Sequence, residues 1–323
     1  MKLETVLKIP DEVELEDVHC PMGCLQHDEN VLTGHDRLYD SAGEYNIVAC
    51  QQCGLMRTNP RPTPETIGYY YPDDYGPYKG TKIISESSEQ KPSFWKQLAK
   101  SLIKFNTENV PEMKPGSMLE IGCASGGFLH KMANKGWQVK GIEFSETAAE
   151  TARSSGYVVK TGSVESVSDF DETFDLAVGW MVVEHLHQPI EALEKLARWT
   201  KPEGWLVISV PNAGALEFRL FKDKWYDLHL PNHLYHFSPQ TLEQLLEKSG
   251  WKMKKVFHQR VISSQMGSLG YVIGGYFPDS KLHKFLTGFS ERGVIWNVAL
   301  YPIAWVLSLF GQTGRMTIWA QKK

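Results

Sequence analysis

Between Gly116 and about His258, short apolar runs alternate with longer segments in which apolar residues recur at helical spacing. The runs predict β-strands at residues Ser117–Ile121, 138–142, 158–159, 176–178 and 206–210. Strands that alternate with helices in this way are typical of a parallel sheet with crossover helices. A last apolar run, residues 316–320, predicts a final strand at the edge of the same sheet.

Capping residues mark the ends of the intervening helices. One helix follows a glycine-rich loop and ends at Gly136, and the next begins at Ser145, a favourable N-cap, and ends at Gly156. Pro189 opens a third helix, because proline fits the first helical turn. A late helix has Ser238 as its N-cap and carries leucines on one face. This order of elements predicts an α/β, Rossmann-like fold.

Ahead of this region, four cysteines form two close pairs, Cys20-x3-Cys24 and Cys50-x2-Cys53. Two tight turns that each offer two thiolates suit tetrahedral zinc, which accepts four sulfur ligands. The sequence therefore predicts a small structural zinc-ribbon module at residues 1–57.

The first cysteine pair is spaced more widely than is usual, which leaves His19 and His27 as alternative zinc ligands. The fifth cysteine, Cys123, lies alone. Four cysteines paired at metal-site spacing, with one left over, suit a reducing compartment better than a disulfide framework. The first ten residues lack the continuous apolar segment of a signal peptide, so a cytoplasmic location is expected.

Residues 58–110 show no periodicity and are interpreted as a linker. Five tyrosines fall near its start: Tyr69, Tyr70, Tyr71, Tyr75 and Tyr78. Because a tyrosine offers both a ring face and a hydroxyl, such a cluster suits a lid over a bound ligand, with Tyr75 and Tyr78 as the preferred candidates. Anchoring of the linker on the surface of the following domain is the alternative.

A glycine-rich loop, residues 120–127, joins the first predicted strand to the first helix. Its glycines let the backbone approach a ligand, and the helix N-terminus directs N–H groups to the same place. Glu143, at the end of the next strand, is positioned to accept both hydroxyls of a ribose. Ala124 stands where a dinucleotide-binding loop has its second glycine, and together with Glu120 it favours S-adenosylmethionine (SAM) over NAD. An NAD-dependent oxidoreductase remains the alternative.

The strands that follow complete the expected cofactor site at the carboxyl end of the sheet, where open α/β sheets bind their ligands. The predicted cofactor-binding residues are Glu120, Gly122, Cys123, Ala124, Gly126, Glu143, Phe144, Ser163, Val164, Trp180 and Met181.

The charge and the C-terminal part narrow the possible partners. The formal net charge is −4, so nucleic acid is not expected as a dominant partner, because phosphate binding needs a basic field. Residues 294–310 are strongly apolar, but Pro302 interrupts them and a membrane span needs about 20 residues. We therefore expect a domain at residues 111–323 with a helical insertion at about 260–312, which is buried, covers the substrate or forms a homodimer. Peripheral membrane contact is the alternative.

Residues 118–258 resemble the class I SAM-dependent methyltransferases, in particular the small-molecule branch that includes ubiquinone-biosynthesis enzymes. The resemblance is carried by the residue 120–126 loop, Glu143, the Phe174-Asp175 strand, the Glu184-His185 pair and the turn at residues 201–205. The N-terminal cysteine region is similar to a bacterial subgroup with a zinc ribbon ahead of the methyltransferase domain, found in sugar, polysaccharide and secondary-metabolite pathways.

This resemblance implies SAM-dependent methyl transfer to a small molecule, with a hydroxyl of a saccharide or related metabolite, free or lipid-linked, as the expected acceptor. A catalytically silent SAM-fold scaffold is a further alternative. His185, His233, Glu184 and Tyr75 are the expected catalytic residues, with a histidine as general base.

The spacing His229-x3-His233-x2-His236 also suggests a metal site. Pro231 prevents one helix face from presenting all three rings, and no carboxylate completes the set in the sequence. The sequence therefore favours a role for these histidines in the pocket over a second metal.

Overall fold

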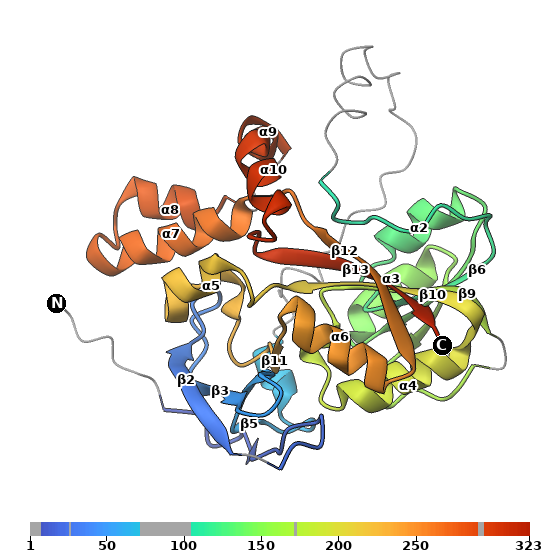
Figure 1. The fold of residues 1–323 in the computed structure, drawn as a ribbon, viewed down its shortest axis with the longest axis horizontal. Coiled ribbons are helices and arrows are strands. Elements are labelled where there is room, and N and C mark those ends of the chain that lie inside the picture. Colours follow the sequence, from blue (N-terminus) through green and yellow to red (C-terminus); the bar gives the residue numbers. More distant parts are fainter. Residues whose placement is uncertain (1–7, 26, 72–104, 171–172, 290–293) are drawn as a thin grey trace.

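The computed structural model describes residues 8–25, 27–71, 105–170, 173–289 and 294–323. A seven-stranded sheet forms the centre of this described part, in the order β12-β13-β10-β9-β6-β7-β8 (Figure 1). Its strands are β6 (Ser117–Ile121), β7 (Gln138–Glu143), β8 (Val158–Thr161), β9 (Phe174–Trp180), β10 (Thr200–Pro211), β12 (Trp251–His258) and β13 (Arg315–Lys322). The five strands from β10 to β8 are parallel, and β13 and β12 are added antiparallel. The predicted Rossmann-like α/β fold is confirmed.

The prediction that the last strand lies at the sheet edge is wrong. β13 pairs with β10 on one side and with β12 on the other, so β12 is the edge strand. The sequence pattern hides β12 because its register shifts between Met253 and Lys255. Such an irregularity interrupts the two-residue alternation by which a half-buried strand is recognised.

Helices cover both faces of the sheet and create a core on each. On one face, α2 (Gly127–Ala133) and α3 (Glu146–Ser154) pack around Leu129 and Ala149. On the other, α4 (Pro189–Trp199) and α6 (Pro239–Lys248) contribute Leu193, Leu196, Leu242 and Leu245. The predicted N-caps are present: the Ser145 side chain accepts a hydrogen bond from the Ala148 N–H, and the Ser238 side chain accepts one from the Thr241 N–H.

The cysteine-bearing region is joined to this domain through a shared sheet. β2 (Asp28–His35), β3 (Glu44–Cys50) and β4 (Met56–Thr58) continue into β11 (Tyr235–His236), which comes from the segment after β10 (Figure 1). A separate pair joins β1 (Leu15–Glu16) to β5 (Arg61–Pro62). The short helix η1 (Ile67–Tyr70) follows and ends beside the central domain. Because β4 and β11 are neighbours, the N-terminal part helps to build the region around His233.

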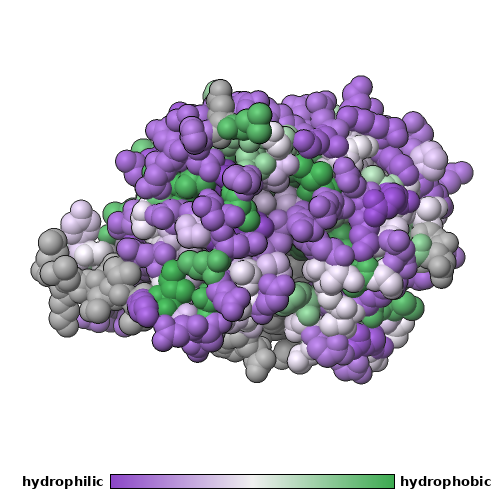
Figure 2. Space-filling view, turned by 90° about the horizontal axis from the view of Figure 1, so that it is seen from below, coloured by the Kyte–Doolittle hydropathy of each residue, from purple (hydrophilic) through white to green (hydrophobic). Residues whose placement is uncertain are grey.

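The described residues between β12 and β13 are mainly helical and lie in the upper left part of Figure 1. It comprises α7 (Ser263–Tyr276), α8 (Lys281–Thr287), α9 (Val294–Ala299) and α10 (Tyr301–Leu309). Among the described residues, none of the helices combines the length and apolar content needed to cross a bilayer. The face in Figure 2, seen from below Figure 1, is largely hydrophilic with separate hydrophobic patches.

Candidate active site

A cavity of about 660 Å³ lies beside the carboxyl ends of the parallel strands. This volume falls within the range of about 300–1,000 Å³ that is typical of ligand pockets. One wall is formed by predicted cofactor-binding residues: Gly122, Ala124, Glu143, Phe144, Ser163, Val164, Trp180 and Met181. The remaining lining includes aromatic and polar side chains from several other parts of the chain, which together form what we call the acceptor wall: Tyr71, His185, His187, His229, His233 and Arg315.

The glycine-rich loop has the backbone conformation that its composition anticipates. Gly122 and Gly126 have φ angles of 64° and 85°, and Ala124 adopts a φ of 45°. The Ala124 N–H donates to Glu143 Oε2 and the Ser145 N–H donates to Glu143 Oε1, both at 2.8 Å. Glu143 therefore links the loop to the start of α3, and its remaining lone pairs are available to a ribose at the cavity wall.

Three residues expected at the cofactor site do not line the cavity. Glu120 is buried behind the loop, where burial raises the pKa of its carboxyl group well above the ordinary value. Cys123 packs into the core beneath α2, and Gly126 lies against Ala152 of α3. These residues support the loop from behind.

The short helix η3 (Val183–His185) follows β9 and carries the Glu184-His185 pair, of which His185 belongs to the acceptor wall. The His185 and His233 rings meet edge to face, with their centroids 4.7 Å apart. The Tyr71 hydroxyl lies 2.8 Å from His185 Nδ1, and this nitrogen also lies 2.9 Å from the Asn232 carbonyl. The carbonyl can only accept, so Nδ1 carries the proton and Nε2 carries the lone pair.

Burial shifts the pKa values of these groups in opposite directions. It raises the pKa of Glu184 to about 8, and it lowers that of His185 to about 4. Burial also lowers the pKa of His233 well below its ordinary value. The two imidazoles are therefore neutral at pH 7, and each has a lone pair free for chemistry.

Two lining residues were not among the preferred candidates: Tyr71 was named only as a member of the tyrosine cluster, and Arg315 was not named. Tyr71 belongs to the tyrosine cluster and lines the cavity, whereas Tyr70 is buried beside Tyr45. The preferred candidates Tyr75 and Tyr78 lie outside the described residues. Arg315 begins β13 and donates to buried Asp227 from Nε at 3.1 Å and Nη2 at 2.6 Å. Nothing local marks this arginine, because its partner is 88 positions away in the sequence.

The four paired cysteines come together as the sequence predicted. The Sγ atoms of the four residues all lie within 4.8 Å of one another: Cys20, Cys24, Cys50 and Cys53. The Cys20 and Cys53 sulfurs are 3.6 Å apart, close to the separation of about 3.8 Å that tetrahedral Zn–S bonds of about 2.3 Å require. His19 and His27 are exposed and stand outside this group. The cysteine set therefore fits a zinc ion.

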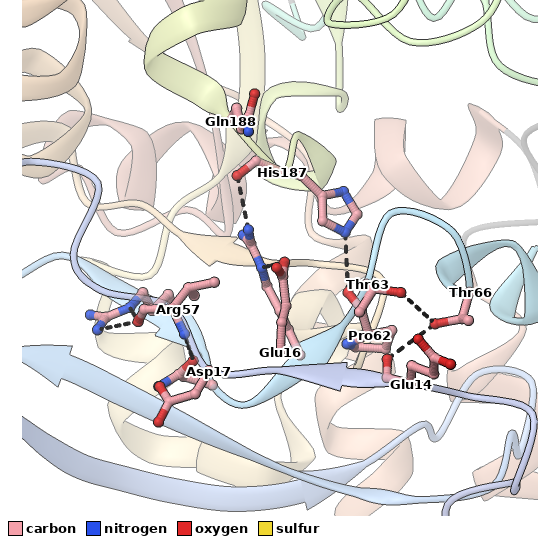
Figure 3. Close-up of polar contacts among 12 residues, drawn as sticks. Glu14, Glu16, Asp17, Arg57, Pro62, Thr63, Thr66, His187 and Gln188 are labelled. Carbon is pink, nitrogen blue, oxygen red and sulfur yellow. Dashed lines mark hydrogen bonds and ion pairs between the residues drawn. The ribbon is translucent and has the colours of Figure 1, made fainter.

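The N-terminal part also forms hydrogen bonds with the acceptor wall. The His187 ring donates from Nε2 to the Pro62 carbonyl at 3.1 Å (Figure 3). The His187 carbonyl accepts from Arg61 Nη2 at 3.1 Å. The Thr58 hydroxyl donates to the His233 carbonyl at 2.7 Å. Residues 58–62, which follow the cysteines, thus form hydrogen bonds with the two segments that carry His185 and His233.

The parallel sheet, the loop at the end of β6 and the cavity define a Rossmann-like methyltransferase domain. Residues 94–256 match the family described as "Methyltransferase domain", Methyltransf_23, and the chain belongs to this family. The family assignment sets aside the NAD-dependent oxidoreductase as an alternative.

Individual relatives are more distant and match over part of their length. The chain is 33% identical over 110 residues to a ubiquinone biosynthesis O-methyltransferase of Thiobacillus denitrificans, covering 32% of this chain and 47% of that protein. It is 28% identical over 199 residues to a tRNA U34 carboxymethyltransferase of Desulfotalea psychrophila, covering 58% of each. The chain spans about half the length of the curated relatives it matches. A solved SAM-dependent methyltransferase from Mesorhizobium loti has 13% identity and a TM-score of 0.45, covering 70% of this chain and 96% of that one.

Proposed function

We propose that this protein transfers the methyl group of SAM to a hydroxyl of a small molecule, most specifically a saccharide or related metabolite. The observation that carries the proposal is the composition of the cavity: residues expected to bind the cofactor line the same cavity as a group of histidines, a tyrosine and an arginine. Methyl transfer is a displacement at the sulfonium carbon, so the protein must align the acceptor oxygen and remove its proton. The two walls are suited to these separate tasks.

The acceptor wall favours a polyhydroxylated substrate. Tyr71 offers a ring face and a hydroxyl, His187 and Gln188 add polar edges, and Arg315 adds a guanidinium group that is paired with Asp227. Such a combination of flat apolar faces and converging polar groups is what recognition of a sugar ring requires. The formal net charge of −4 opposes RNA as the general substrate, because RNA binding depends on phosphate contacts.

Activation of the acceptor falls to His185 and His233. Both rings are neutral and line the cavity, so the simplest route is proton transfer from the hydroxyl to an Nε2 lone pair as the methyl group moves. A carboxyl oxygen of Glu184 lies within 4.8 Å of a nitrogen of each ring. Burial raises the pKa of this carboxyl group to about 8, so it would stabilise the imidazolium only after losing its own proton. Tyr71 contacts His185 through its hydroxyl and orients the ring.

We further propose that Cys20, Cys24, Cys50 and Cys53 hold one structural zinc ion. Four thiolates leave no open coordination position for a substrate, so the ion would stabilise the fold and take no part in the reaction. The ion would affect the cavity only indirectly, because Thr58 and Arg61 hydrogen-bond to the carbonyl groups of His233 and His187 on the acceptor wall.

Replacing Glu143 with alanine is expected to weaken SAM binding by about 1–3 kcal/mol, because charge-assisted hydrogen bonds to the ribose would be lost. Isothermal titration calorimetry measures the difference. Glu146→Ala is the matched control, since Glu146 is exposed in the first turn of α3 and does not line the cavity. Equal SAM affinities for the Glu143 variant and the parent protein would remove Glu143 from the cofactor site.

The substrate class is tested by incubating the protein with methyl-labelled SAM and separated cell fractions: small polar metabolites, lipid-linked saccharides and RNA. The proposal predicts label in a saccharide fraction, in a form that resists mild base as an ether does. Label confined to RNA would contradict it.

A further inference from the structure

Glu184 is a buried acid without a partner. Its side chain is fully buried, and neither carboxylate oxygen accepts a hydrogen bond from any described residue. Leaving a buried polar group unpaired costs about 1–3 kcal/mol, and more for a charged one. Such a group calls for an explanation in terms of something that binds it.

The two neighbouring histidines are fixed in one tautomer by the backbone. His185 donates from Nδ1 to the Asn232 carbonyl, and His233 donates from Nδ1 to the Asp227 carbonyl at 2.8 Å. In each ring, Nε2 is left with its lone pair. Metal-binding histidines show this arrangement, in which the second nitrogen donates to a carbonyl that sets the orientation of the ring.

One donor atom from each of Glu184, His185 and His233 lies within 4.8 Å of the other two. Two imidazoles and a carboxylate that leave several positions open form a common binding set for divalent transition metals. We propose that Glu184, His185 and His233 bind a divalent transition-metal cation at the acceptor wall of the cavity. The sequence favoured a pocket role for the spaced histidines because no carboxylate completed the set. Glu184 comes close to His233 only in the fold.

The surrounding charges permit a cation here. Arg315 is the nearest basic group to act on Glu184, but it is paired with Asp227 at 2.6 Å, so the two charges largely cancel. The four cysteine thiols form a separate cluster with its own donor set. The proposed ion would therefore be additional to the structural zinc.

This inference rests on the proposed function, and it replaces the direct proton transfer to His185 or His233 described above, because their Nε2 lone pairs would bind the ion. The ion would hold the acceptor oxygen and lower the pKa of its hydroxyl. As the O–H bond breaks, the proton would pass to His229, whose Nε2 is buried without a hydrogen-bond partner in the described part of the chain and whose ring stacks on His233 at 4.7 Å. The oxygen then bonds to the methyl carbon, and the sulfur leaves as a neutral thioether.

The test is a titration of the purified, zinc-loaded full chain with Co²⁺, followed by absorption spectroscopy and calorimetry. The inference predicts one Co²⁺ per chain with weak ligand-field bands and without the sulfur-to-cobalt charge-transfer bands of a cysteine site. Glu184→Gln keeps the shape of the side chain and removes its charge, and it should weaken Co²⁺ binding by at least about tenfold. Glu194→Gln, at an exposed position of α4, is the matched control and should bind Co²⁺ like the parent chain.

Absence of Co²⁺ binding in the parent chain would overturn the inference without reliance on any variant. Equal affinity of the parent chain and Glu184→Gln would overturn it as well. SAM affinity is measured in parallel on each protein. Retained SAM binding without Co²⁺ binding would refute the metal site alone, whereas loss of SAM binding in the parent chain would refute the proposed function.

Discussion

Replacing His185 with alanine is expected to lower turnover by about 10²–10⁴-fold while leaving SAM affinity unchanged. The ring lines the cavity, and its Nδ1 lies within hydrogen-bond distance of the Asn232 carbonyl and the Tyr71 hydroxyl, so its loss should affect mainly the transfer step. His233→Ala should behave in the same way, since its ring meets His185 at 4.7 Å. The measurement is kcat on the true acceptor, paired with calorimetry of SAM binding.

His130→Ala is the matched control for these variants. His130 lies on α2 and bonds to the Tyr157 hydroxyl, outside the cavity. Its replacement should leave turnover near the parent value. If both His185→Ala and His233→Ala turn over at the parental rate, activation of the acceptor takes place elsewhere.

Loss of zinc is expected to abolish both the fold of the N-terminal part and turnover. Structural zinc contributes about 10–16 kcal/mol of apparent binding free energy to small zinc modules. The effect should extend to the active site because β4 pairs with β11 and the Thr58 hydroxyl bonds to the His233 carbonyl. A Cys50→Ser, Cys53→Ser double variant should therefore lose metal, thermal stability and activity together.

Elemental analysis, thermal unfolding and turnover of the same preparations test this coupling. Cys123→Ala is the control: this thiol is buried in the core near the cofactor loop, and its replacement should leave one zinc per chain in place. Full turnover by a preparation shown to contain no metal would contradict the coupling.

The parts of the fold that the sequence predicted are those with a local cause. Ser145 and Ser238 each cap a helix through a residue three positions ahead, so the signal lies within a few residues. β6 is a continuous apolar run because it is buried on both faces in the middle of the sheet. The cysteine pairs were also recognisable from the sequence, because the binding of one ion by two tight turns requires a close spacing within each pair.

The parts that the sequence did not predict depend on contacts between distant segments. β11 is two residues long and exists as a strand because β4 lies beside it. Glu184 was recognised as part of a motif, but its proximity to His233 follows from the fold that brings the segment after β10 back to η3. Arg315 and Tyr71 reach the same wall from opposite ends of the chain. No local sequence pattern predicts that residues so far apart in the chain line the same cavity.

The N-terminal part contributes to the cavity and to its surroundings. It contributes Tyr71 to the cavity, it fixes His187 through Arg61 and Pro62, and it supports the segment that carries His233. The proposed acceptor wall is therefore built by both the cysteine-bearing part and the methyltransferase domain.

The central claim, that the cavity binds SAM, is tested most directly by calorimetric titration of the full chain with SAM and, separately, with NAD. The account predicts that SAM binds at about one site per chain and that NAD shows no saturable binding. Saturable binding of NAD together with no binding of SAM would contradict it.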